Sequence, residues 1–585
     1  MKKNIILLLF FLVSVTIFGQ QIPYKISKSE LFQDEFKDSV ILLSEKNPNN
    51  GELTLVRSYS GTMLSQGEGF YIEKYDSNLK LKKAFDFEMK HPGYQKYNLI
   101  LGVFIMDSDI HFVEIYYDLN EKSYICIDNV MSEDFKNTSK ELFRFSKEDL
   151  KKIGSFSLQQ KFHTRAKETW TNDNSGAINS ENTLGNTNGF YNSFFGRRNS
   201  FAYNYASVYE NAGGGMGCDI ILTVNETKTA FTIAIDTNAD EKDVLKMYLF
   251  DNKLIKKIDF IYENDIKDKK CFYQNIQVSE DGNSIYLLAK AYAPDLKKKK
   301  EGGKYYYEFS KITAEKKITQ KIDTDEHFVG ALKTYFHNNE LISIGFYSDA
   351  ADYKYNGICA FKLDPNTLEL KSSNYNPFTS QFLFDKYGTA KSKSLKNIDF
   401  KKVFFTETNE IIINAEESYI EQQYYFASSG MSPTGTFGGA GYYNNNGGSR
   451  LHYSYDDIII VKLNPDGNLL WARNINKKQS TTSDDNSFIS YTSILNKDKN
   501  YFFINTKDDV KKLKDGRIEF GQIRKNKSNL NVIQVDANGN FEYEKILDDD
   551  ENAVPFMVAK GITLDNTVYF LGRRGKTKQL LKVTL

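Results

Sequence analysis

The feature that most constrains the fold of this 585-residue chain is a strand–turn–strand repeat that returns along its whole length. Each copy has a short apolar strand, a turn that begins with Asp, Asn or Thr, and a second strand, as in ICAFKLDPNTLEL from Ile358 and IIIVKLNPDGNLLW from Ile458. Alternating apolar residues that end at such turns are typical of β-hairpins. The turn positions of the eight copies are Asp76, Asp128, Asp251, Thr313, Asp364, Asn464, Asp536 and Thr584.

A polar turn followed by another apolar strand stands before most copies, as in EDGNSIYLLAKAY from Glu280 and HNNELISIGFYS from His337. The shortest spacings between copies are about 50 residues, close to the length of one four-stranded blade of a β-propeller. We therefore expect an all-β chain that forms a β-propeller of eight blades, or alternatively seven. Two or three β-sandwiches built from similar hairpins are the competing interpretation.

Two long insertions interrupt the repeat, at about residues 146–217 and 420–455. Both are rich in Gly, Asn and Ser, which predicts loops. The first insertion opens with Ser146 and Asp149, which have the spacing of a helix capping box. The last unit of the repeat lacks an outer strand, so we expect residues 22–38 to supply a strand that pairs with the C-terminal one and closes the ring.

The first 20 residues, MKKNIILLLFFLVSVTIFGQ, have the layout of a secretory signal peptide. Two lysines precede a short apolar run, and the small Gly19 stands near its end. A membrane anchor is the alternative, but the run is shorter than a span requires, and no later run is long enough. We expect a signal peptide at 1–20 and the propeller at 21–585, without a transmembrane segment after cleavage. The ending FGQQ resembles signal peptides of Gram-negative envelope proteins, which implies export to the periplasm or the cell surface.

The charge balance argues against a nucleic-acid partner. The chain has 76 basic and 76 acidic residues, so its formal net charge is zero, whereas nucleic-acid-binding proteins normally carry a basic surface. The cysteines are few and widely spaced, at Cys126, Cys218, Cys271 and Cys359. We expect mostly unpaired core thiols, with two disulfides as the alternative.

The sequence contains no motif for a metal, a nucleotide or a catalytic nucleophile. The six histidines form no zinc-binding pattern, and His111 reads as a hydrogen-bonded strand residue. A stretch from Asp236 begins like a calcium loop but lacks the Gly and the final Glu that such a loop requires. We therefore expect no metal site and no cofactor. Among 76 acidic residues, the sequence does not select the carboxylate pair that glycoside cleavage would need.

Tyrosines cluster around the second insertion and give the one candidate ligand-binding surface. Tyrosine offers rigid amphipathic contact area at low entropic cost, which suits recognition loops. The alternative is that the insertion shares the bias of a chain with 38 tyrosines. The candidate residues are Tyr424, Tyr425, Tyr442, Tyr443, His452, Tyr453 and Tyr455.

The units IIIVKLNPDGNLLWARN and GITLDNTVYFLGRR resemble the repeats of exported bacterial β-propeller-like proteins, which carry a strand, a K-L-D-x-x-G-N turn and a strand with Trp. The resemblance implies a fold and an envelope location but no activity. We expect a non-catalytic interaction scaffold, rather than an enzyme, that binds an envelope protein or glycan. Two alternatives stay open. One is a carbohydrate-active hydrolase or lyase with acidic residues near the propeller axis, and the other is a subunit of an envelope assembly.

Overall fold

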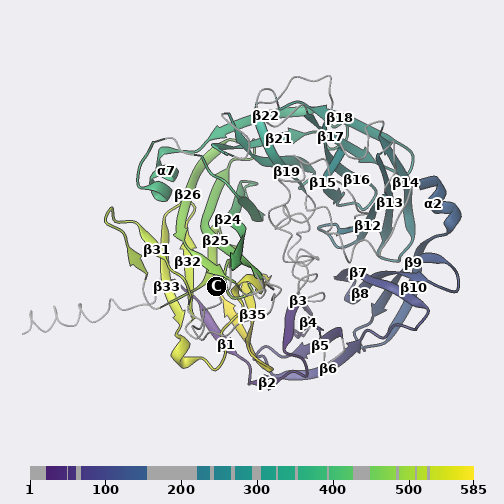
Figure 1. The fold of residues 1–585 in the computed structure, drawn as a ribbon, viewed down its shortest axis with the longest axis horizontal. Helices are drawn as coiled ribbons and strands as arrows, with labels where there is room; N and C mark the ends of the chain where they lie inside the picture. The colour runs from purple at the N-terminus through teal and green to yellow at the C-terminus, as the bar shows by residue number, and fades with distance from the viewer. Residues whose placement is uncertain are drawn as a thin grey trace, which may run out of the picture.

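The computed structural model describes residues 22–48, 50–60, 68–153, 220–237, 243–264, 271–292, 305–324, 327–349, 354–391, 394–425, 448–482, 486–507, 510–523 and 528–585. Within these ranges the chain is all-β, as expected. Its strands form eight sheets that stand side by side around a ring (Figure 1). Each pairing between neighbouring strands is antiparallel, except that one short pair, described below, is parallel.

Five sheets are four-stranded meanders in which neighbours in sequence are also neighbours in space. The first two comprise β3 (Asp38–Lys46), β4 (Leu53–Ser60), β5 (Glu68–Tyr75) and β6 (Leu81–Glu88), then β7 (Gln95–Met106), β8 (Asp109–Asp118), β9 (Ser123–Met131) and β10 (Asn137–Phe145). The next three comprise β11 (Ile220–Val224), β12 (Ala230–Thr237), β13 (Asp243–Asp251) and β14 (Lys256–Asn264), then β15 (Cys271–Val278), β16 (Ile285–Tyr292), β17 (Tyr305–Ile312) and β18 (Lys317–Ile322), then β19 (Phe328–His337), β20 (Glu340–Ser348), β21 (Gly357–Leu363) and β22 (Leu370–Pro377).

The remaining three sheets depart from the simple meander. The sixth contains β23 (Ile398–Phe405), β24 (Ile411–Tyr425), β25 (Gly448–Leu463) and β26 (Leu469–Lys477), joined by β27 (Gln479–Thr481), β30 (Lys511–Lys512) and β31 (Ile518–Phe520), where β31 pairs parallel with β26. The seventh contains β28 (Tyr491–Asn496), β29 (Lys499–Thr506), β32 (Asn529–Val535) and β33 (Phe541–Leu547). The eighth joins β34 (Ile562–Leu564), β35 (Thr567–Arg574) and β36 (Thr577–Thr584) to β1 (Lys25–Lys28) and β2 (Phe32–Gln33).

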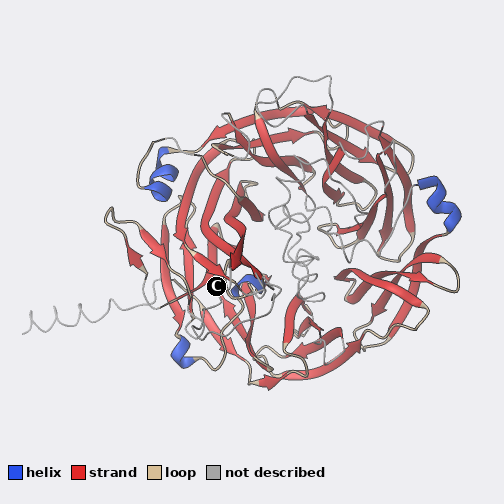
Figure 2. Cartoon of the chain, viewed as in Figure 1, coloured by secondary structure: helices blue, strands red, loops and turns tan. Residues whose placement is uncertain are grey.

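The helices are short. The α-helices α2 (Lys147–Ile153) and α7 (Ser380–Tyr387) lie at the outer edge of the ring (Figure 2), and two 3₁₀ turns, η2 (Asp549–Glu551) and η3 (Val558–Lys560), precede β34. In the described part of the chain, no helix has the length and apolar character needed to cross a membrane. The predicted capping box is confirmed at α2, where the Asp149 backbone N–H donates to Ser146 Oγ and the Ser146 N–H donates to an Asp149 carboxylate oxygen.

Apolar residues of neighbouring sheets pack together, and aromatic rings mark the contacts. Phe70 of the first sheet lies against Phe112 of the second, with ring centroids 4.6 Å apart. Phe503 of the seventh sheet lies against Phe570 of the eighth at 5.5 Å. These tilted and edge-on ring pairs are the geometries that aromatic side chains prefer. Each sheet thus gains its stability from the sheets on either side of it.

The two ends of the described chain meet in the eighth sheet. β1 pairs with β36 in an antiparallel register that places Lys25 opposite Thr584. A buried arginine of the first sheet then holds the following segment in place. Arg57 Nε donates to Glu73 at 2.9 Å, and Arg57 Nη1 donates to Asp34 at 2.8 Å. The Asp34 carboxylate also accepts a hydrogen bond of 2.7 Å from Ser39 Oγ.

The predicted turn positions are confirmed at most copies of the repeat. Asn464 Oδ1 accepts hydrogen bonds from the backbone N–H groups of Asp466 and Asn468, which closes the turn between β25 and β26. Gly467 completes this turn with a φ of 85°, which a glycine adopts without steric cost. The same capping by a side-chain oxygen occurs at Asp76, Asp251, Thr313, Asp364 and Asp536.

The prediction of a turn at Asp128 is wrong. Asp128 lies inside β9, where it is fully buried and accepts a hydrogen bond of 2.7 Å from His111 Nδ1 of β8. The turn falls at Ser132, whose Oγ accepts from the Lys136 backbone N–H. β9 continues past the aspartate, paired with both β8 and β10 as far as Met131, and the histidine provides a partner for the buried carboxylate. The prediction that His111 is a hydrogen-bonded strand residue is confirmed by the same pair.

The cysteine prediction is confirmed for two residues. Cys126 in β9 and Cys359 in β21 are buried free thiols, and burial raises the pKa of both. Cys271 is also buried, in β15, and Cys218 lies outside the described residues. The two free thiols act as small apolar core residues.

Candidate functional site

The connections between strands divide the described chain into two faces. Within a sheet, the first and second strands are joined by a short turn, as at 107–108, and so are the third and fourth, as at 76–80. We term this end of the strands the turn face. Because neighbouring strands run antiparallel, the connections between second and third strands, and between sheets, lie at the opposite end, here termed the insertion face. Both predicted insertions are flanked by strand ends at the insertion face. One insertion lies between β10 and β11, and the other lies between β24 and β25.

The insertion face carries a strand extension of the sixth sheet. Residues 418–425 of β24 pair only with residues 448–455 of β25, beyond the last residues that pair with β23 and β26. Eight strand residues span roughly 26 Å at 3.3 Å per residue. We term this two-stranded extension the hairpin arm. Its base has a third strand, because β27 pairs with residues 453–455.

The candidate tyrosines fall at different places on this arm. The backbones of Tyr424 and Tyr425 are paired with Ser449 and Gly448, at the far end of the arm, and their side chains lie outside the described part. Tyr442 and Tyr443 also lie outside the described residues. The ligand-binding role of these four tyrosines stays a prediction.

The other three candidates lie at the base of the arm. His452 is half-buried on β25. Tyr453 and Tyr455 are buried and pack with Ile489 and the partly buried Ile523. The Tyr455 hydroxyl accepts a hydrogen bond of 2.7 Å from the side-chain amide of Asn486. Tyr453 and Tyr455 therefore support the arm in this structure, and their predicted contact with a ligand is untested.

A group of buried charges lies directly below the arm, and sequence reasoning did not single it out. Glu416 of β24 is completely buried, and its carboxylate forms ion pairs with Lys477 of β26 at 2.8 Å and Lys401 of β23 at 3.1 Å. Ser490, just before β28, donates a hydrogen bond of 2.6 Å to the same carboxylate. We term Glu416, Lys401, Lys477 and the neighbouring Asp399 the charge cluster. It joins three strands of the sixth sheet to the seventh.

The Glu416 carboxylate is held in its charged form by its partners. Burial alone would raise its pKa, but Lys477 and Lys401 hold the pKa of Glu416 below the ordinary value. Burial lowers the pKa of Lys477, against the attraction of Glu416. Lys477 also donates a hydrogen bond of 2.7 Å to the backbone carbonyl of Tyr455. The same ammonium thus neutralises the cluster and holds a strand of the arm at its base.

Asp399 stands directly opposite Glu416 in the register of β23 and β24. Burial raises the pKa of Asp399 to about 6, although Lys401 opposes the shift, and the Ser418 hydroxyl donates to its carboxylate. Two neighbouring carboxyl groups with pKa values pushed apart are the arrangement that acid–base catalysis uses. In this structure, however, Glu416 is inaccessible and already paired with two lysines.

Helix α7 holds the same part of the sixth sheet from outside. The helix begins at Thr379, whose Oγ accepts from the Phe382 backbone N–H, and ends at Gly388 in the left-handed conformation. Lys386 forms ion pairs of 2.7 Å with both Glu417 of β24 and Asp457 of β25. The two strands of the arm are therefore tied together where they leave the sheet. No group of three or more His, Cys, Asp or Glu in the described ranges is arranged to hold a metal ion.

Comparisons with known proteins add little to this picture. No protein-family model and no curated protein matches the chain. Among solved structures, prolyl oligopeptidase B from Galerina marginata is similar at a TM-score of 0.34 and 8% identity, over 94% of this chain and 55% of that one. An apocarotenoid oxygenase from Synechocystis has a TM-score of 0.30 and 6% identity, over 90% and 94% of the two chains. The chain thus spans 55% of the length of that oligopeptidase, and similarities this weak carry no conclusion about activity.

Proposed function

We propose that the chain is an exported, non-catalytic interaction scaffold of the cell envelope, which binds a protein or glycan partner at the insertion face. In this proposal the eight sheets are the blades of a β-propeller. The pairing of β1 with β36, which gives the eighth sheet its outer strand, supports a ring of eight blades over seven and closure of the ring by the two ends of the chain. The signal-peptide layout of residues 1–20 supports export.

The observation that carries the proposal is the braced base of the hairpin arm. An isolated two-stranded hairpin is marginally stable in water. Here the strands that leave the sheet are tied by Lys386 to Glu417 and Asp457, and by Lys477 to Glu416. A projecting segment that is held in advance loses less conformational entropy on binding. The arm therefore suits the presentation of a contact surface to a partner.

The test is capture of a partner by immobilised protein from a detergent-solubilised envelope extract. The bait is the chain from Gln21 onward. In a second bait, residues 426–447 are replaced by Asn-Gly, which favours a tight hairpin turn and leaves the described strands intact. A matched control replaces residues 293–304 in the same way, since they also join a second to a third strand at the insertion face.

We expect one protein or glycan to be retained in fixed proportion by the full chain and by the control, and to be lost when residues 426–447 are replaced. Binding should then be reproduced with the purified partner. Retention that is equal in all three baits would exclude residues 426–447, which join the two strands of the arm, from the interface. The scaffold proposal itself fails if neither protein nor glycan is retained by the full chain. Co-retention of several proteins in fixed proportion would instead favour a subunit of an envelope assembly.

A carbohydrate-active enzyme is the second candidate, and Asp399 opposite Glu416 is the observation that favours it. Their pKa values are pushed in opposite directions, as acid and base roles require. The burial of Glu416 weighs against it, because a substrate would have to displace Lys401 and Lys477. The test is release of reducing sugar ends from envelope polysaccharide by the wild type and by Asp399→Asn. Release that the folded variant loses would favour the enzyme, and no release by the wild type would contradict it.

A further inference from the structure

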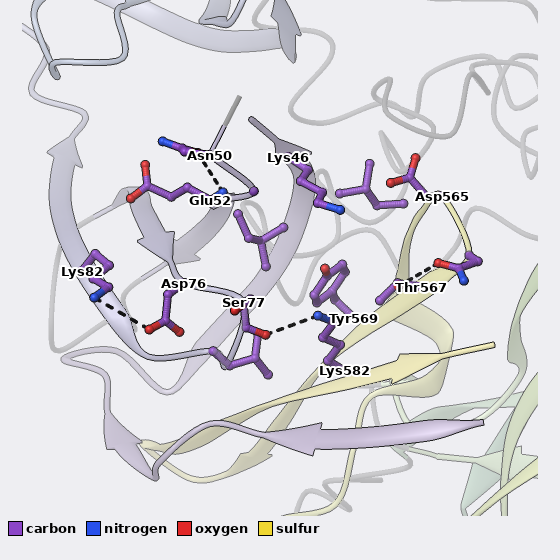
Figure 3. A pocket seen from close by; sticks show the side chains of 15 residues that line it. Lys46, Asn50, Glu52, Asp76, Ser77, Lys82, Asp565, Thr567, Tyr569 and Lys582 are labelled. Carbon is purple, nitrogen blue, oxygen red and sulfur yellow. Dashed lines mark hydrogen bonds and ion pairs between the residues drawn. The ribbon is translucent and has the colours of Figure 1, made fainter. Parts of the chain in front are cut away.

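A pocket of about 490 Å³ opens on the turn face, at the opposite end of the strands from the hairpin arm. Figure 3 shows the side chains that line it. One wall comes from the first sheet, at the turns between β3 and β4 and between β5 and β6. The other wall comes from the last sheet, at the turn between β34 and β35 and at β35 and β36. The pocket therefore lies where the two ends of the described chain meet. Its volume falls in the range of sites for small ligands.

Two lysines of this pocket have no carboxylate partner among the described residues. Lys46 extends from the end of β3, and Lys582 of β36 donates only to the backbone carbonyl of Ser77, at 3.3 Å. Lys82, by contrast, is paired with Asp76 at 3.7 Å (Figure 3). Burial lowers the pKa of Lys582, and the positive charge of Lys46 lowers it further. Two ammonium groups that repel each other in a partly enclosed space would both be stabilised by an anion between them.

The rest of the lining offers groups that bind hydroxyls and the apolar faces of a sugar ring. Asp565 and Asn566 lie at the turn between β34 and β35 and provide acceptors and donors. The Asn566 side-chain amide donates one N–H to the Leu585 carbonyl at 2.8 Å and keeps a second N–H for a ligand. The half-buried Leu564 provides apolar wall beside the buried Leu53 and Leu79. Tyr569 stands between the two sides (Figure 3). This mixture differs from a site for an inorganic anion. A phosphate or sulfate ion would be repelled by the carboxylate and would gain no binding energy from the leucines.

We propose that this pocket binds an anionic sugar of one or two rings that carries a single carboxylate. The carboxylate would lie between Lys46 and Lys582, the hydroxyls would bond to Asp565 and Asn566, and the ring would rest on the apolar wall. Because such a ligand touches both the first and the last sheet, its binding stabilises the junction between them. The pocket is separate from the hairpin arm, so a test of sugar binding does not depend on the proposed scaffold function.

The test is calorimetric titration of the full chain with glucuronate and a glucuronate-containing disaccharide. Glucose and inorganic phosphate are the comparison ligands. We expect glucuronate or its disaccharide to bind more tightly than either comparison ligand, and binding to weaken at high salt. Lys46→Gln and Lys582→Gln should each weaken binding at least about tenfold, the effect of losing one charged hydrogen bond. Lys316→Gln is the matched control, because this exposed lysine lies at another turn of the same face.

Each outcome decides the proposal. Phosphate that binds as tightly as glucuronate would overturn the sugar part of the inference. Equal loss in the Lys316 control, or no binding by any of the ligands at millimolar concentration, would overturn the site. If Lys582→Gln fails to fold by circular dichroism, Lys46→Gln and Asp565→Asn carry the test. A rise in the unfolding temperature with glucuronate, absent in Lys46→Gln, is the second readout.

Discussion

Replacement of Glu114 by glutamine should change how the stability of this protein depends on pH. Glu114 lies in β8, between the first and second sheets, with only 5% of its surface exposed. One carboxyl oxygen accepts from the Asn129 side chain at 3.3 Å, and the other has no hydrogen-bond partner among the described residues. The His91 ring nitrogen Nδ1 lies 4.0 Å from that second oxygen. Glu114 is thus a buried acid without a compensating positive charge.

The size of the effect follows from the pKa of this carboxyl group. Burial raises it from 4.5 to about 7, opposed by the Asn129 hydrogen bond and reinforced by the nearby Glu68. Such a rise corresponds to about 3 kcal/mol of folding free energy that is lost when the carboxyl group ionises, because each tenfold change in proton affinity is worth about 1.36 kcal/mol. Between pH 4.5 and about 7 the unfolded chain releases this proton while the folded chain keeps it. The free energy of unfolding therefore falls as pH rises through this window and is unaffected outside it.

The assay is urea-induced unfolding of the wild type and Glu114→Gln from about pH 4 to about pH 8. Glutamine keeps the shape of the side chain and cannot ionise. As pH rises through the window, the free energy of unfolding of the variant should therefore increase by up to about 3 kcal/mol relative to that of the wild type. Glu68 and His91 are present in both proteins, so the difference curve contains the titration of Glu114 together with its coupling to these two neighbours. The exposed Glu133→Gln is the control and should run parallel to the wild type. Parallel curves for Glu114→Gln as well would refute the reasoning.

Three further substitutions test other parts of the fold by urea unfolding. Arg57→Ala should cost about 3–5 kcal/mol, because two buried carboxylates lose their partner, and a cost below about 1 kcal/mol would contradict the role given to this arginine. Gly467→Ala should cost at least about 1–2 kcal/mol, because L-residues are strained at a φ of 85° and the new Cβ would lie 2.7 Å from Ala360 Cβ; an unchanged stability would show that the turn relaxes. Lys477→Met should cost about 3–5 kcal/mol by leaving Glu416 buried with one ion pair fewer, and adding Glu416→Leu should restore most of it. A double variant as unstable as the single one would show that the charges themselves hold the arm.

The elements that the sequence predicts well are those that local chemistry determines. An aspartate or asparagine caps its own turn through backbone N–H groups two to four residues away, so the turns at Asp364 and Asn464 could be read directly. Asp128 follows the same local pattern but does not form a turn, since its partner, His111, comes from another strand. The pattern alone does not show which aspartates have such partners.

The charge cluster could not be found from the sequence for a related reason. Lys401, Glu416 and Lys477 come from three strands, and only the pairing of those strands brings them together. In a chain with 26% charged residues, none of the three stands out by type. One feature of the sequence does point to Glu416. Every residue of β24 from Ile411 to Glu416 is buried, so Glu416 is a charged side chain in a strand that is buried on both sides.

The pairing of β1 with β36 has a consequence for how the chain reaches its native state. Residues that meet in this region, such as Tyr24 and Glu544, are 520 positions apart in the sequence. Contacts between such distant residues form slowly. Until β1 arrives, β36 presents an open strand edge, and a second copy of the chain can fill that edge with its own β1. The same register that completes one molecule thus also permits two nascent molecules to exchange their first strands.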